Sequence, residues 1–379
     1  MTGAADAGPS EAVLGDHVHS QLTALGNVVG LAASDTAAYG RVLLDALGDS
    51  AHRPLSLPPA SPSFISDDHT PVEFSLAFTP GAAPVLRMLV EPGWDSADMG
   101  GSGRAGLEVL REWAGRWNFS TDRLDTLEDL FFPAAAEGPF AVWYALELRP
   151  GGVPGVKVYL NPSAGGAGHA ARTVREALRR LGHRGAFAAL PEAAGYPFFA
   201  LDLGSWAMPR VKVYVRHTRL STDHARVLSR AYSDLAGGQT KAFFQRATEP
   251  APALGRETDG REPLRRPPLT THSFTDSGTG TASGFTLHIP VRDYVHSDEE
   301  AHARATALLT DFGMDASVLT RALAALTPRE LGDGVGLIAY LALAHQQHRQ
   351  PRITAYVSSE AYAVRPPLTA HRPDEARTA

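Results

Sequence analysis

Three short segments of this chain place a cationic residue and a tyrosine at alternate positions. The segments cover residues 156–160 (Val-Lys-Val-Tyr-Leu), 210–215 (Arg-Val-Lys-Val-Tyr-Val) and 352–357 (Arg-Ile-Thr-Ala-Tyr-Val). Because side chains alternate between the two faces of a β-strand, each cation shares a face with its tyrosine, while aliphatic residues cover the other face. Such a face can bind an anion through the cation and stabilise a nearby positive charge with the aromatic ring.

Repetition distinguishes this pattern from ordinary strand alternation. A half-exposed strand also alternates polar and apolar residues, with its polar side in water, so one segment alone favours neither interpretation. Lys-Val-Tyr occurs at 157–159 and again at 212–214, and the third segment keeps the tyrosine. The recurrence indicates one structural unit that is used several times.

The composition limits the ligands that such a face could bind. The 379 residues are 44% hydrophobic and 20% charged, which is typical of a globular chain with one large or two ordinary domains. The formal net charge is −6, so neither nucleic acid nor a membrane surface is an expected partner. Cations on internal strand faces would act locally, and a small anion is their expected ligand.

Several other kinds of chemistry are absent from the sequence. There is no cysteine, which excludes disulfides, thiolate metal sites and cysteine nucleophiles. The sequence contains no Gly-x-Ser-x-Gly, P-loop or His-Glu-x-x-His motif. No segment is apolar enough to span a membrane, and residues 1–11 lack the basic and hydrophobic regions of a secretory signal, so we expect a cytoplasmic protein.

Amphipathic helices tend to occur in pairs, and two strands follow each pair. Helical patterns are predicted at 17–30, 35–47, 106–117, 121–130, 170–181, 186–190, 223–246, 298–312 and 316–326. Strands are predicted at 72–78, 85–91, 140–148, 156–161, 196–203, 210–216, 285–291, 334–344 and 352–357. Asp35 and Thr121 are the expected N-caps of their helices.

About ten strands joined by hairpins need either a very wide open sheet or closure into a barrel. We therefore predict an α+β fold, a closed antiparallel ten-stranded β-barrel of repeated ααββ units ringed by helices, with the cation and tyrosine face in the lumen. A flat sheet with a wet polar face is the alternative. The expected domain covers residues 1–363, with a mobile loop or insertion at 249–284 and a disordered tail at 364–379.

Further motifs occur in a fixed order along these elements. They are Val-Glu-Phe-Ser at 72–75, Arg87 before Val-Glu-Pro at 90–92, the Lys-x-Tyr strands, and Pro-Val-Arg-Asp-Tyr at 290–294. Together with the ααββ succession they resemble the aromatic prenyltransferases of the dimethylallyltryptophan synthase type, most of all the bacterial indole or tryptophan branch. The resemblance runs from residue 72 to residue 362. It implies the ABBA or PT barrel and transfer of a prenyl group from a prenyl diphosphate to an aromatic ring.

The resemblance also implies roles for residues on the repeated face. Four cations would bind the diphosphate: Arg87, Lys157, Arg210 and Lys212. Four tyrosines would shield the allyl cation: Tyr159, Tyr214, Tyr356 and, as the weakest match, Tyr340. Glu73 would recognise the indole N–H. Arg352 has the parity to join the diphosphate group, although it has no firm counterpart in the family.

Two departures from the fungal members bear on removal of the ring proton. On the strand before Pro-Val-Arg, this chain has Thr286 and His288 where the fungal members place a glutamine and a shielding tyrosine. The fungal lysine before the third strand is replaced by an aromatic residue, Trp143 or Tyr144. A histidine at 288 is either a buried structural residue or the acceptor of the ring proton, and we retain His288 as a candidate catalytic residue.

The residues favour ionisation of the diphosphate without a metal. A departing diphosphate can be stabilised by Mg²⁺ held by carboxylates, or by lysines and arginines. Asp67 and Asp68 are followed by His-Thr-Pro rather than by further acids, which is typical of a turn. We therefore predict neither a metal nor another cofactor.

The predicted reaction transfers a dimethylallyl group from dimethylallyl diphosphate to the indole of L-tryptophan. Carbon 6 is the expected position, by analogy with relatives of actinobacterial type. A tryptophan-containing cyclic dipeptide, an indolactam or a phenol is an alternative acceptor. A non-catalytic barrel that carries an isoprenoid is an alternative of another class, but it would need an apolar lumen, which the predicted cations disfavour. The expected protein is a monomer or a homodimer.

Overall fold

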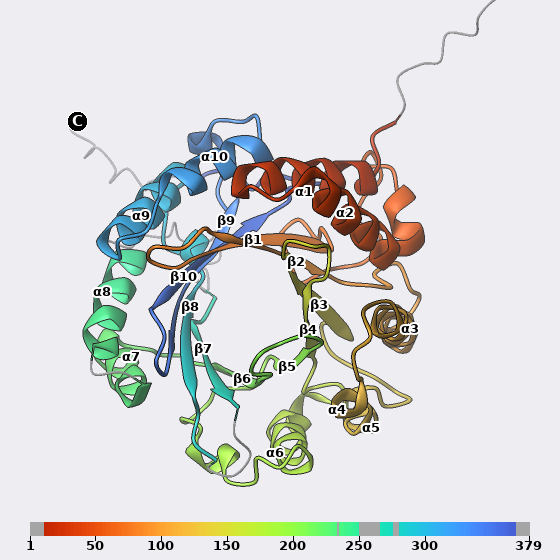
Figure 1. Cartoon of the computed structure of the whole chain (residues 1–379), viewed down its shortest axis with the longest axis vertical. Coiled ribbons are helices and arrows are strands. Elements are labelled where there is room, and N and C mark those ends of the chain that lie inside the picture. The colour runs from red at the N-terminus through yellow and green to blue at the C-terminus, as the bar shows by residue number, and fades with distance from the viewer. Residues whose placement is uncertain (1–10, 233–234, 250–265, 276–279, 369–379) are drawn as a thin grey trace, which may run out of the picture.

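Ten antiparallel strands close into a barrel at the centre of the molecule (Figure 1). The computed structural model describes residues 11–232, 235–249, 266–275 and 280–368. Consecutive strands are neighbours around the barrel, and β1 pairs with β10 to close it. The strands are β1 Val72–Phe78, β2 Val85–Val90, β3 Val142–Glu147, β4 Gly155–Leu160, β5 Phe199–Leu203, β6 Val211–Arg216, β7 Leu269–Phe274, β8 Gly284–Ile289, β9 Ile338–Gln346 and β10 Arg352–Ser358. The predicted closed barrel is confirmed.

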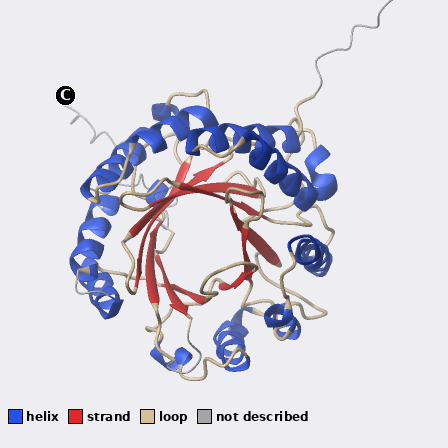
Figure 2. Ribbon diagram, viewed as in Figure 1, coloured by secondary structure: helices blue, strands red, loops and turns tan. Residues whose placement is uncertain are grey.

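Helices cover the outside of the barrel between successive hairpins (Figure 2). They are α1 Leu14–Val29, α2 Ala33–Leu47, α3 Met99–Trp117, α4 Asp122–Asp125, α5 Glu128–Phe131, α6 Ala170–Arg180, α7 Thr222–Ser229, α8 Ala236–Thr248, α9 Asp298–Asp311 and α10 Ser317–Leu326. This order confirms the predicted ααββ succession. None of the described helices is long and apolar enough to cross a membrane.

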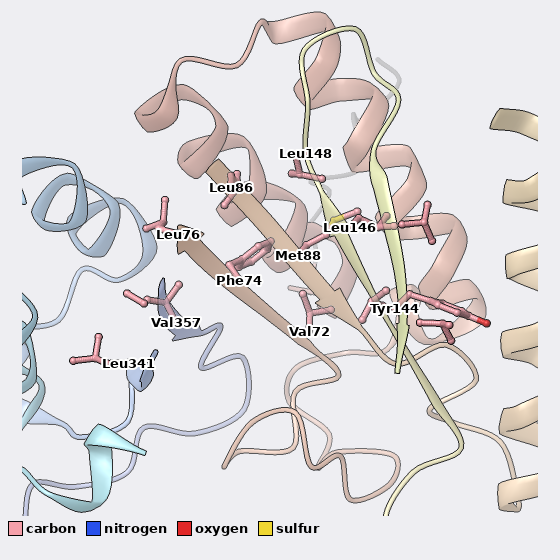
Figure 3. Close-up of a cluster of buried hydrophobic side chains, with 14 of the residues drawn as sticks. Val72, Phe74, Leu76, Leu86, Met88, Tyr144, Leu146, Leu148, Leu341 and Val357 are labelled. Atoms are coloured by element: carbon pink, nitrogen blue, oxygen red, sulfur yellow. The ribbon is translucent and has the colours of Figure 1, made fainter. Parts of the chain in front are cut away.

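The hydrophobic core lies between the barrel and its helices, because strand residues of one parity face outward. The outward residues of β1 and β2 include Val72, Phe74, Leu76, Leu86 and Met88 (Figure 3). Each of them is buried. Since the side-chain period of a strand is two, the residues between them must face the lumen. Packing of the apolar face against the helices therefore directs Glu73 and Arg87 inward.

Helix α3 begins well before the predicted residue 106. The carboxylate of Asp98 accepts a hydrogen bond from the Gly101 N–H at 2.6 Å and caps the helix. The run Gly-Gly-Ser-Gly at 100–103 has low helix propensity, so the sequence pattern gave no sign of this first turn.

The two predicted N-caps differ in outcome. Asp35 is not a cap, because it lies inside the first turn of α2 and accepts from the Gly151 N–H at 3.0 Å, which joins α2 to the β3–β4 turn. Thr121 occupies the N-cap position of α4, but its hydroxyl donates to Asp125 and does not cap the helix. The long helix predicted at 223–246 is divided into α7 and α8.

Strand β7 lies within the segment 249–284 that is predicted to be a loop. Its outward residues include Thr270 and His272, which are polar, so it lacks an aliphatic face. The Thr270 hydroxyl lies 2.8 Å from Nε2 of His217 and 3.2 Å from Nε2 of His272. These hydrogen bonds satisfy the buried polar groups, and the prediction is wrong for residues 269–274. Residues 250–265 and 276–279 of the segment lie outside the described residues.

The predicted disordered tail is hydrogen-bonded to two connecting segments over its first residues. The Arg365 carbonyl accepts from the Val335 N–H at 3.0 Å, and the Leu368 N–H donates to the His296 carbonyl at 2.9 Å. The prediction is therefore wrong for residues 364–368. Residues 369–379 lie outside the described part of the chain.

Helix α3 approaches the barrel closely at Gly106. A Cβ placed on this glycine would lie 2.3 Å from Cγ1 of Val142 on β3. The Tyr144 hydroxyl donates to the Gly106 carbonyl at 2.7 Å, so the helix and the strand are also joined by a buried hydrogen bond. The absence of a side chain at this position sets the distance between α3 and the wall of the barrel.

Replacement of Gly106 by alanine should destabilise the protein. We expect Gly106→Ala to lower the free energy of unfolding by about 2 kcal/mol, because the added methyl group overpacks a close contact. Gly115 provides a matched control on the same helix, since nothing lies within 4 Å of a Cβ placed there. Gly115→Ala should raise the stability by up to about 1 kcal/mol through helix propensity. Urea unfolding measures both changes, and equal effects would contradict the packing argument.

Candidate active site

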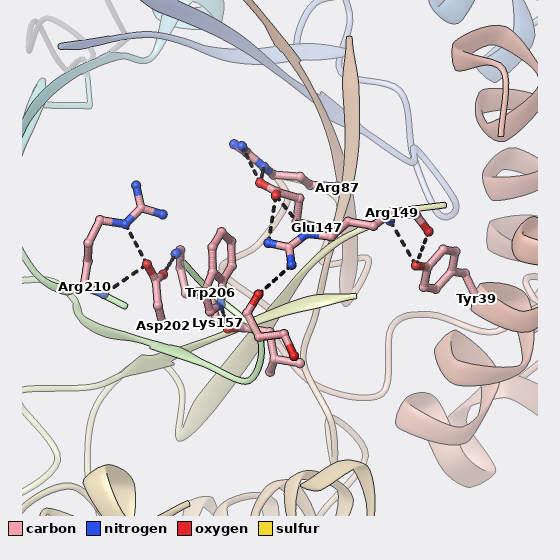
Figure 4. A network of polar contacts seen from close by, with 10 residues as sticks. Tyr39, Arg87, Glu147, Arg149, Lys157, Asp202, Trp206 and Arg210 are labelled. Carbon is pink, nitrogen blue, oxygen red and sulfur yellow. Dashed lines mark hydrogen bonds and ion pairs between the residues drawn. The ribbon is translucent and has the colours of Figure 1, made fainter. Parts of the chain in front are cut away.

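Five cationic side chains from four strand regions meet in one part of the lumen. This cationic layer consists of Arg87, Lys157, Arg210, Lys212 and Arg352, and all five line a single cavity. Figure 4 shows part of it, with the carboxylates that approach from the neighbouring strands. The alternation of inward and outward residues along β2, β4, β6 and β10 produces the cluster. The predicted diphosphate-binding residues therefore lie together, as their parity requires.

Asp202 on β5 is a buried counter-ion of the cationic layer (Figure 4). Its side chain has no exposed surface, bonds to Nζ of Lys157 and accepts from Nε of Arg210 at 2.6 Å. Burial alone would raise the pKa of Asp202, but the charges of Lys157, Arg210 and Lys212 lower it below its ordinary value. The carboxylate therefore stays ionised and holds two of the cations in place.

Glu147 on β3, two strands away from Asp202, has the same role. It accepts from Nη2 of Arg87 at 2.9 Å and from Nη2 of Arg149 at 3.2 Å. Burial acts to raise its pKa, yet the two arginines lower the pKa of Glu147 to about 2. At the rim, Arg149 and Lys157 lie over the indole of Trp206, at 4.7 Å and 4.9 Å from the ring centre. These cation–π contacts stabilise the two positive charges.

Two cations of the layer have no partner within the described part of the chain. Lys212 is only 6% exposed and has no hydrogen bond or ion pair there. Nε of Arg352 is buried without an acceptor. Burial lowers the pKa of both groups, that of Arg352 to about 9, and the nearby charge of Arg210 adds to the effect. Buried donors without partners are costly, so this arrangement favours an anion bound between them.

The cationic layer carries more positive than negative charge. Its five cations exceed the two carboxylates Glu147 and Asp202 by three charges. A diphosphate ester carries roughly three negative charges near neutral pH. Among the described residues, no group of three histidine or carboxylate side chains is placed to hold a metal ion. The cavity can therefore stabilise a departing diphosphate with side chains that are already in position.

Aromatic rings line the lumen beside the cationic layer. The rings of Tyr159, Tyr214, His288 and Tyr356 follow one another at centre-to-centre distances of 5.7, 5.6 and 6.0 Å. Tyr340 adjoins Tyr356 at 6.4 Å. The Tyr214 hydroxyl donates to that of Tyr159 at 3.2 Å. All four predicted shield tyrosines thus face the lumen, where their rings can exclude water and stabilise a cation.

Strand parity places Trp143 and Tyr144 on opposite faces of β3. Trp143 faces the lumen, where its ring stacks on Phe140 at 4.2 Å and contacts Phe198 at 5.2 Å. Tyr144 points outward and bonds to Gly106 on α3. An inward tryptophan extends the aromatic wall of the cavity.

Glu73 on β1 lies in the wall shared by the cationic and aromatic parts of the cavity. It is 6% exposed and has no hydrogen bond or ion pair within the described residues. Burial raises the pKa of Glu73 to about 8, although the nearby charge of Arg292 opposes the shift. A hydrogen-bond donor from a ligand would favour the ionised form, so Glu73 is suited to accept an N–H from a flat aromatic molecule.

His288 on β8 lies between Tyr214 and Tyr356. Its Nε2 lies 3.0 Å from the Thr271 hydroxyl. Burial, followed by the charges of Lys212 and Arg352, lowers the pKa of His288 to about 3. The imidazole is therefore neutral, and the hydrogen bond to Thr271 fixes the orientation of the ring. This geometry agrees with a buried structural histidine, and it also leaves Nδ1 available to a ligand.

The sequence reasoning missed Asp202, Glu147 and Trp206. Asp202 interrupts the apolar strand Phe-Ala-Leu-Asp-Leu and pairs directly with Lys157 in the register of β4 and β5. A lone acid in an otherwise hydrophobic strand is a signal that could have revealed it, because such acids are rarely buried unpaired. Trp206 lies in the β5–β6 connection, where alternation gives no guidance.

Comparison with known proteins agrees with this geometry. The model of the tryptophan dimethylallyltransferase family matches residues 36–320. The chain belongs to this family. It is therefore an aromatic tryptophan prenyltransferase, and the predicted family and enzyme class are confirmed. No curated protein sequence matches the chain.

Several solved structures are similar over almost the whole chain. The prenyltransferase PriB, in a ternary complex with L-tryptophan and dimethylallyl thiolodiphosphate, is 58% identical, with a TM-score of 0.89 and coverage of 95% of this chain and 100% of that chain. The 5-dimethylallyltryptophan synthase from Streptomyces coelicolor is 58% identical, with a TM-score of 0.88 and coverage of 94% and 100%. The 6-dimethylallyltryptophan synthase from Micromonospora olivasterospora, solved with DMASPP and Trp, is 35% identical, with a TM-score of 0.82 and coverage of 94% and 100%.

Substitutions at Lys212 and Glu73 should separate anion binding from acceptor binding. Lys212→Met removes an unpaired cation, so we expect weaker binding of inorganic diphosphate and a loss of about 2 to 3 kcal/mol of transition-state stabilisation. Glu73→Gln preserves the shape of the side chain and should leave diphosphate affinity nearly unchanged while it weakens acceptor binding. Calorimetry and steady-state kinetics measure the two effects. Loss of diphosphate affinity in Glu73→Gln alone would contradict this placement of the two ligands.

Tyr214 should be required to keep the allyl cation away from water. Tyr214→Phe retains the ring face, whereas Tyr214→Ala removes the face and opens a space that water can enter. We expect the phenylalanine variant to keep most of its coupling, and the alanine variant to release more diphosphate than prenylated product, with dimethylallyl alcohol as the difference. The ratio of the two products is the measurement, because simple destabilisation lowers both in proportion. A folded Tyr214→Ala with unchanged coupling would make Tyr214 a packing residue.

Proposed function

We propose that this chain transfers the dimethylallyl group of dimethylallyl diphosphate to the indole ring of L-tryptophan, at carbon 6 and without a metal. One observation carries the proposal: unpaired cations that can hold a diphosphate lie directly beside a ring of tyrosines in the same lumen. The ternary complex of PriB with L-tryptophan and a dimethylallyl thiolodiphosphate supports the choice of both substrates.

The cationic layer would promote ionisation of the prenyl donor. The bond between the allylic carbon and the bridging oxygen breaks, and its electron pair leaves with the diphosphate. Lys212 and Arg352, which lack partners in the described chain, would bind the anion. The lysine would act as a point charge, and the arginine would donate two parallel N–H hydrogen bonds. Asp202 and Glu147 keep the other cations in position, so little reorganisation is needed as the negative charge develops.

The aromatic layer would then hold the allyl cation until the indole attacks. Tyr159, Tyr214 and Tyr356 present their rings to the lumen, and their quadrupoles favour a positive charge there. Glu73 would accept the indole N–H, which orients the ring and raises its electron density as the carbon–carbon bond forms. A π-electron pair of the indole makes the new bond to the allylic carbon, and the ring becomes a cationic arenium.

His288 is the proposed acceptor of the proton that the arenium loses. It lies in the ring of aromatic side chains, at 5.6 Å from Tyr214 and 6.0 Å from Tyr356 between ring centres. In the free protein, burial and the cations Lys212 and Arg352 keep its pKa low. A bound diphosphate would cancel much of the field of these cations and make the imidazole more basic at the step where a base is needed.

Carbon 6 is the proposed position, and carbon 5 is the second candidate. The 35% identical relative from Micromonospora olivasterospora is named for position 6. The 58% identical relative from Streptomyces coelicolor is named for position 5, and its higher identity makes carbon 5 the second candidate. Both atoms lie on the benzene side of the indole, so the two candidates share one substrate orientation to within a small rotation.

The decisive experiment is incubation of the purified protein with L-tryptophan and dimethylallyl diphosphate, followed by mass spectrometry and two-dimensional NMR of the product. We expect one monoprenylated tryptophan with the substituent at carbon 6. A product at carbon 5 would replace the proposed position and leave the acceptor unchanged. Conversion of phenols or cyclic dipeptides with none of tryptophan would overturn the proposed acceptor.

The same reaction in excess EDTA tests the proposal that no metal is needed. Turnover should persist, with at most a modest change on addition of Mg²⁺, because lysine and arginine side chains neutralise the diphosphate. Complete loss on chelation, with recovery on addition of Mg²⁺, would show that a metal ion carries this role.

A further inference from the structure

Hydroxyl groups and one imidazole lie side by side across three neighbouring strands on the wall of the lumen. Thr271 on β7 pairs directly with Tyr214 on β6. On its other side Thr271 pairs with Thr286 of β8, two positions before His288. Residues directly opposite on adjacent antiparallel strands have Cβ atoms about 5 Å apart, so Thr271 is near both side chains. It therefore stands between a tyrosine of the aromatic layer and the proposed acceptor of the ring proton.

A run of polar contacts joins these side chains. Nε2 of His288 lies 3.0 Å from the Thr271 hydroxyl. Burial raises the pKa of Tyr214, and a hydrogen bond from the Thr271 hydroxyl opposes this shift. The Tyr214 hydroxyl donates in turn to that of Tyr159 at 3.2 Å. His288, Thr271, Tyr214 and Tyr159 thus form a continuous hydrogen-bonded path, in that order.

Every member of the path can both receive and release a proton. A hydroxyl group is donor and acceptor at once, and a neutral imidazole accepts at one nitrogen while it donates at the other. Burial raises the pKa of Tyr159 as well as that of Tyr214, so both phenols keep their protons in the free protein. Thr271 is 1% exposed and lines neither the cationic nor the aromatic part of the cavity. It is therefore placed to act on other side chains rather than on a ligand.

The two ends of the path face different partners in the proposed reaction. At one end, Nδ1 of His288 is available to the arenium. At the other end, Tyr159 lines the cavity two residues from Lys157 of the cationic layer, beside the proposed place of the diphosphate. Cleavage of the carbon–oxygen bond leaves the diphosphate with one more negative charge than its ester carried. The path therefore connects the group that must lose a proton to the group that most favours one.

We propose that Thr271 relays the ring proton from His288 to Tyr214, along a path that ends at the departing diphosphate. This inference rests on the proposed function. The carbon–hydrogen bond of the arenium breaks, its electron pair restores the aromatic ring, and Nδ1 of His288 takes the proton. Nε2 passes its own proton to Thr271, whose hydroxyl proton moves to Tyr214. Tyr214 passes its proton to Tyr159, and Tyr159 protonates a diphosphate oxygen. Each hydroxyl group ends with one proton, and exchange with water restores the starting arrangement after the products leave.

The test interrupts the path and measures whether loss of the ring proton becomes slow. In the unmodified protein, fast transfer commits the arenium to product. L-tryptophan deuterated at every carbon of the benzene ring should therefore show a kinetic isotope effect near one on kcat/KM. We expect Thr271→Val to lower kcat by about 30-fold and to raise the isotope effect clearly above one, because the arenium can then expel the allyl cation before it loses the proton. Thr271→Ser keeps the hydroxyl group, so it should retain most of the rate and an isotope effect near one.

Tyr214→Phe interrupts the path one step further on and leaves the contact between Thr271 and His288 in place. It should raise the isotope effect in the same way, even with an unchanged ratio of diphosphate to prenylated product, because its ring still excludes water. Thr354→Val is the matched control, since Thr354 lies on β10 in the wall of the same cavity but outside the path. Whatever the rate of this control, its isotope effect should stay near one.

An isotope effect near one in Thr271→Val would overturn the relay, as would an equal effect in the unmodified protein or in Thr354→Val. A rise in Thr271→Val without a rise in Tyr214→Phe would also overturn it, because Thr271 would then only orient His288. Circular dichroism and binding of inorganic diphosphate show whether each variant is folded. If Thr271→Val fails either test, Tyr159→Phe takes its place with the same expected rise. Failure of the unmodified protein to prenylate L-tryptophan is a separate result, which would refute the proposed function rather than the relay alone.

Discussion

Five cations gathered inside one barrel repel one another, and two carboxylates determine how much of that repulsion remains in the folded protein. Asp202 fixes Lys157 and Arg210, and Glu147 fixes Arg87. Lys212 and Arg352 are left without such partners in the described chain. Complete neutralisation would stabilise the fold but would remove the electrostatic reason for binding an anion. The excess charge is a local feature, because the whole chain carries a formal net charge of −6.

Closure of the barrel makes this arrangement possible. Every strand has two neighbours, so no edge can slip, and the packed outer face allows only one register. Lys157 and Tyr159 are two residues apart on β4, as are Lys212 and Tyr214 on β6, and two residues span about 7 Å along a strand. That distance is comparable to the length of a five-carbon allyl group with its bridging oxygen. The strand geometry would therefore place the leaving diphosphate beside lysine and arginine side chains, and the remaining allyl cation beside tyrosine rings.

Much of this architecture could be predicted from local periodicity. The alternation in residues 156–160 and 210–215 is sufficient to place Lys157, Tyr159, Lys212 and Tyr214 on one face, because helices cover the other face and leave no choice of side. Strand β7 could not be predicted in the same way. Its outward face is stabilised by hydrogen bonds among Thr270 and histidines, and a hydrophobic period does not report such contacts.

Contacts that join distant parts of the chain could also not be predicted from the sequence. Asp67 pairs with Arg266 across 199 positions, and no local pattern connects them. Trp206 lies in a turn, where the period of two ends, and its position under Arg149 and Lys157 depends on the closed barrel. Of the charged residues that the sequence reasoning missed, Glu147 is the last residue of β3 and Asp202 interrupts an apolar run in β5.

In the proposed reaction, the spacing of the groups that hold the two substrates determines which ring carbon is attacked. In that reaction, the cationic layer and the tyrosines locate the allyl carbon, and Glu73 locates the indole nitrogen. These two fixed points limit the rotation of the indole within its plane. A shift of less than an ångström at one anchor is enough to exchange neighbouring ring carbons at the point of attack, because reaction requires close alignment. Relatives with one fold and similar lengths, named for carbon 5 and carbon 6, are therefore consistent with a common chemistry and a variable rotation.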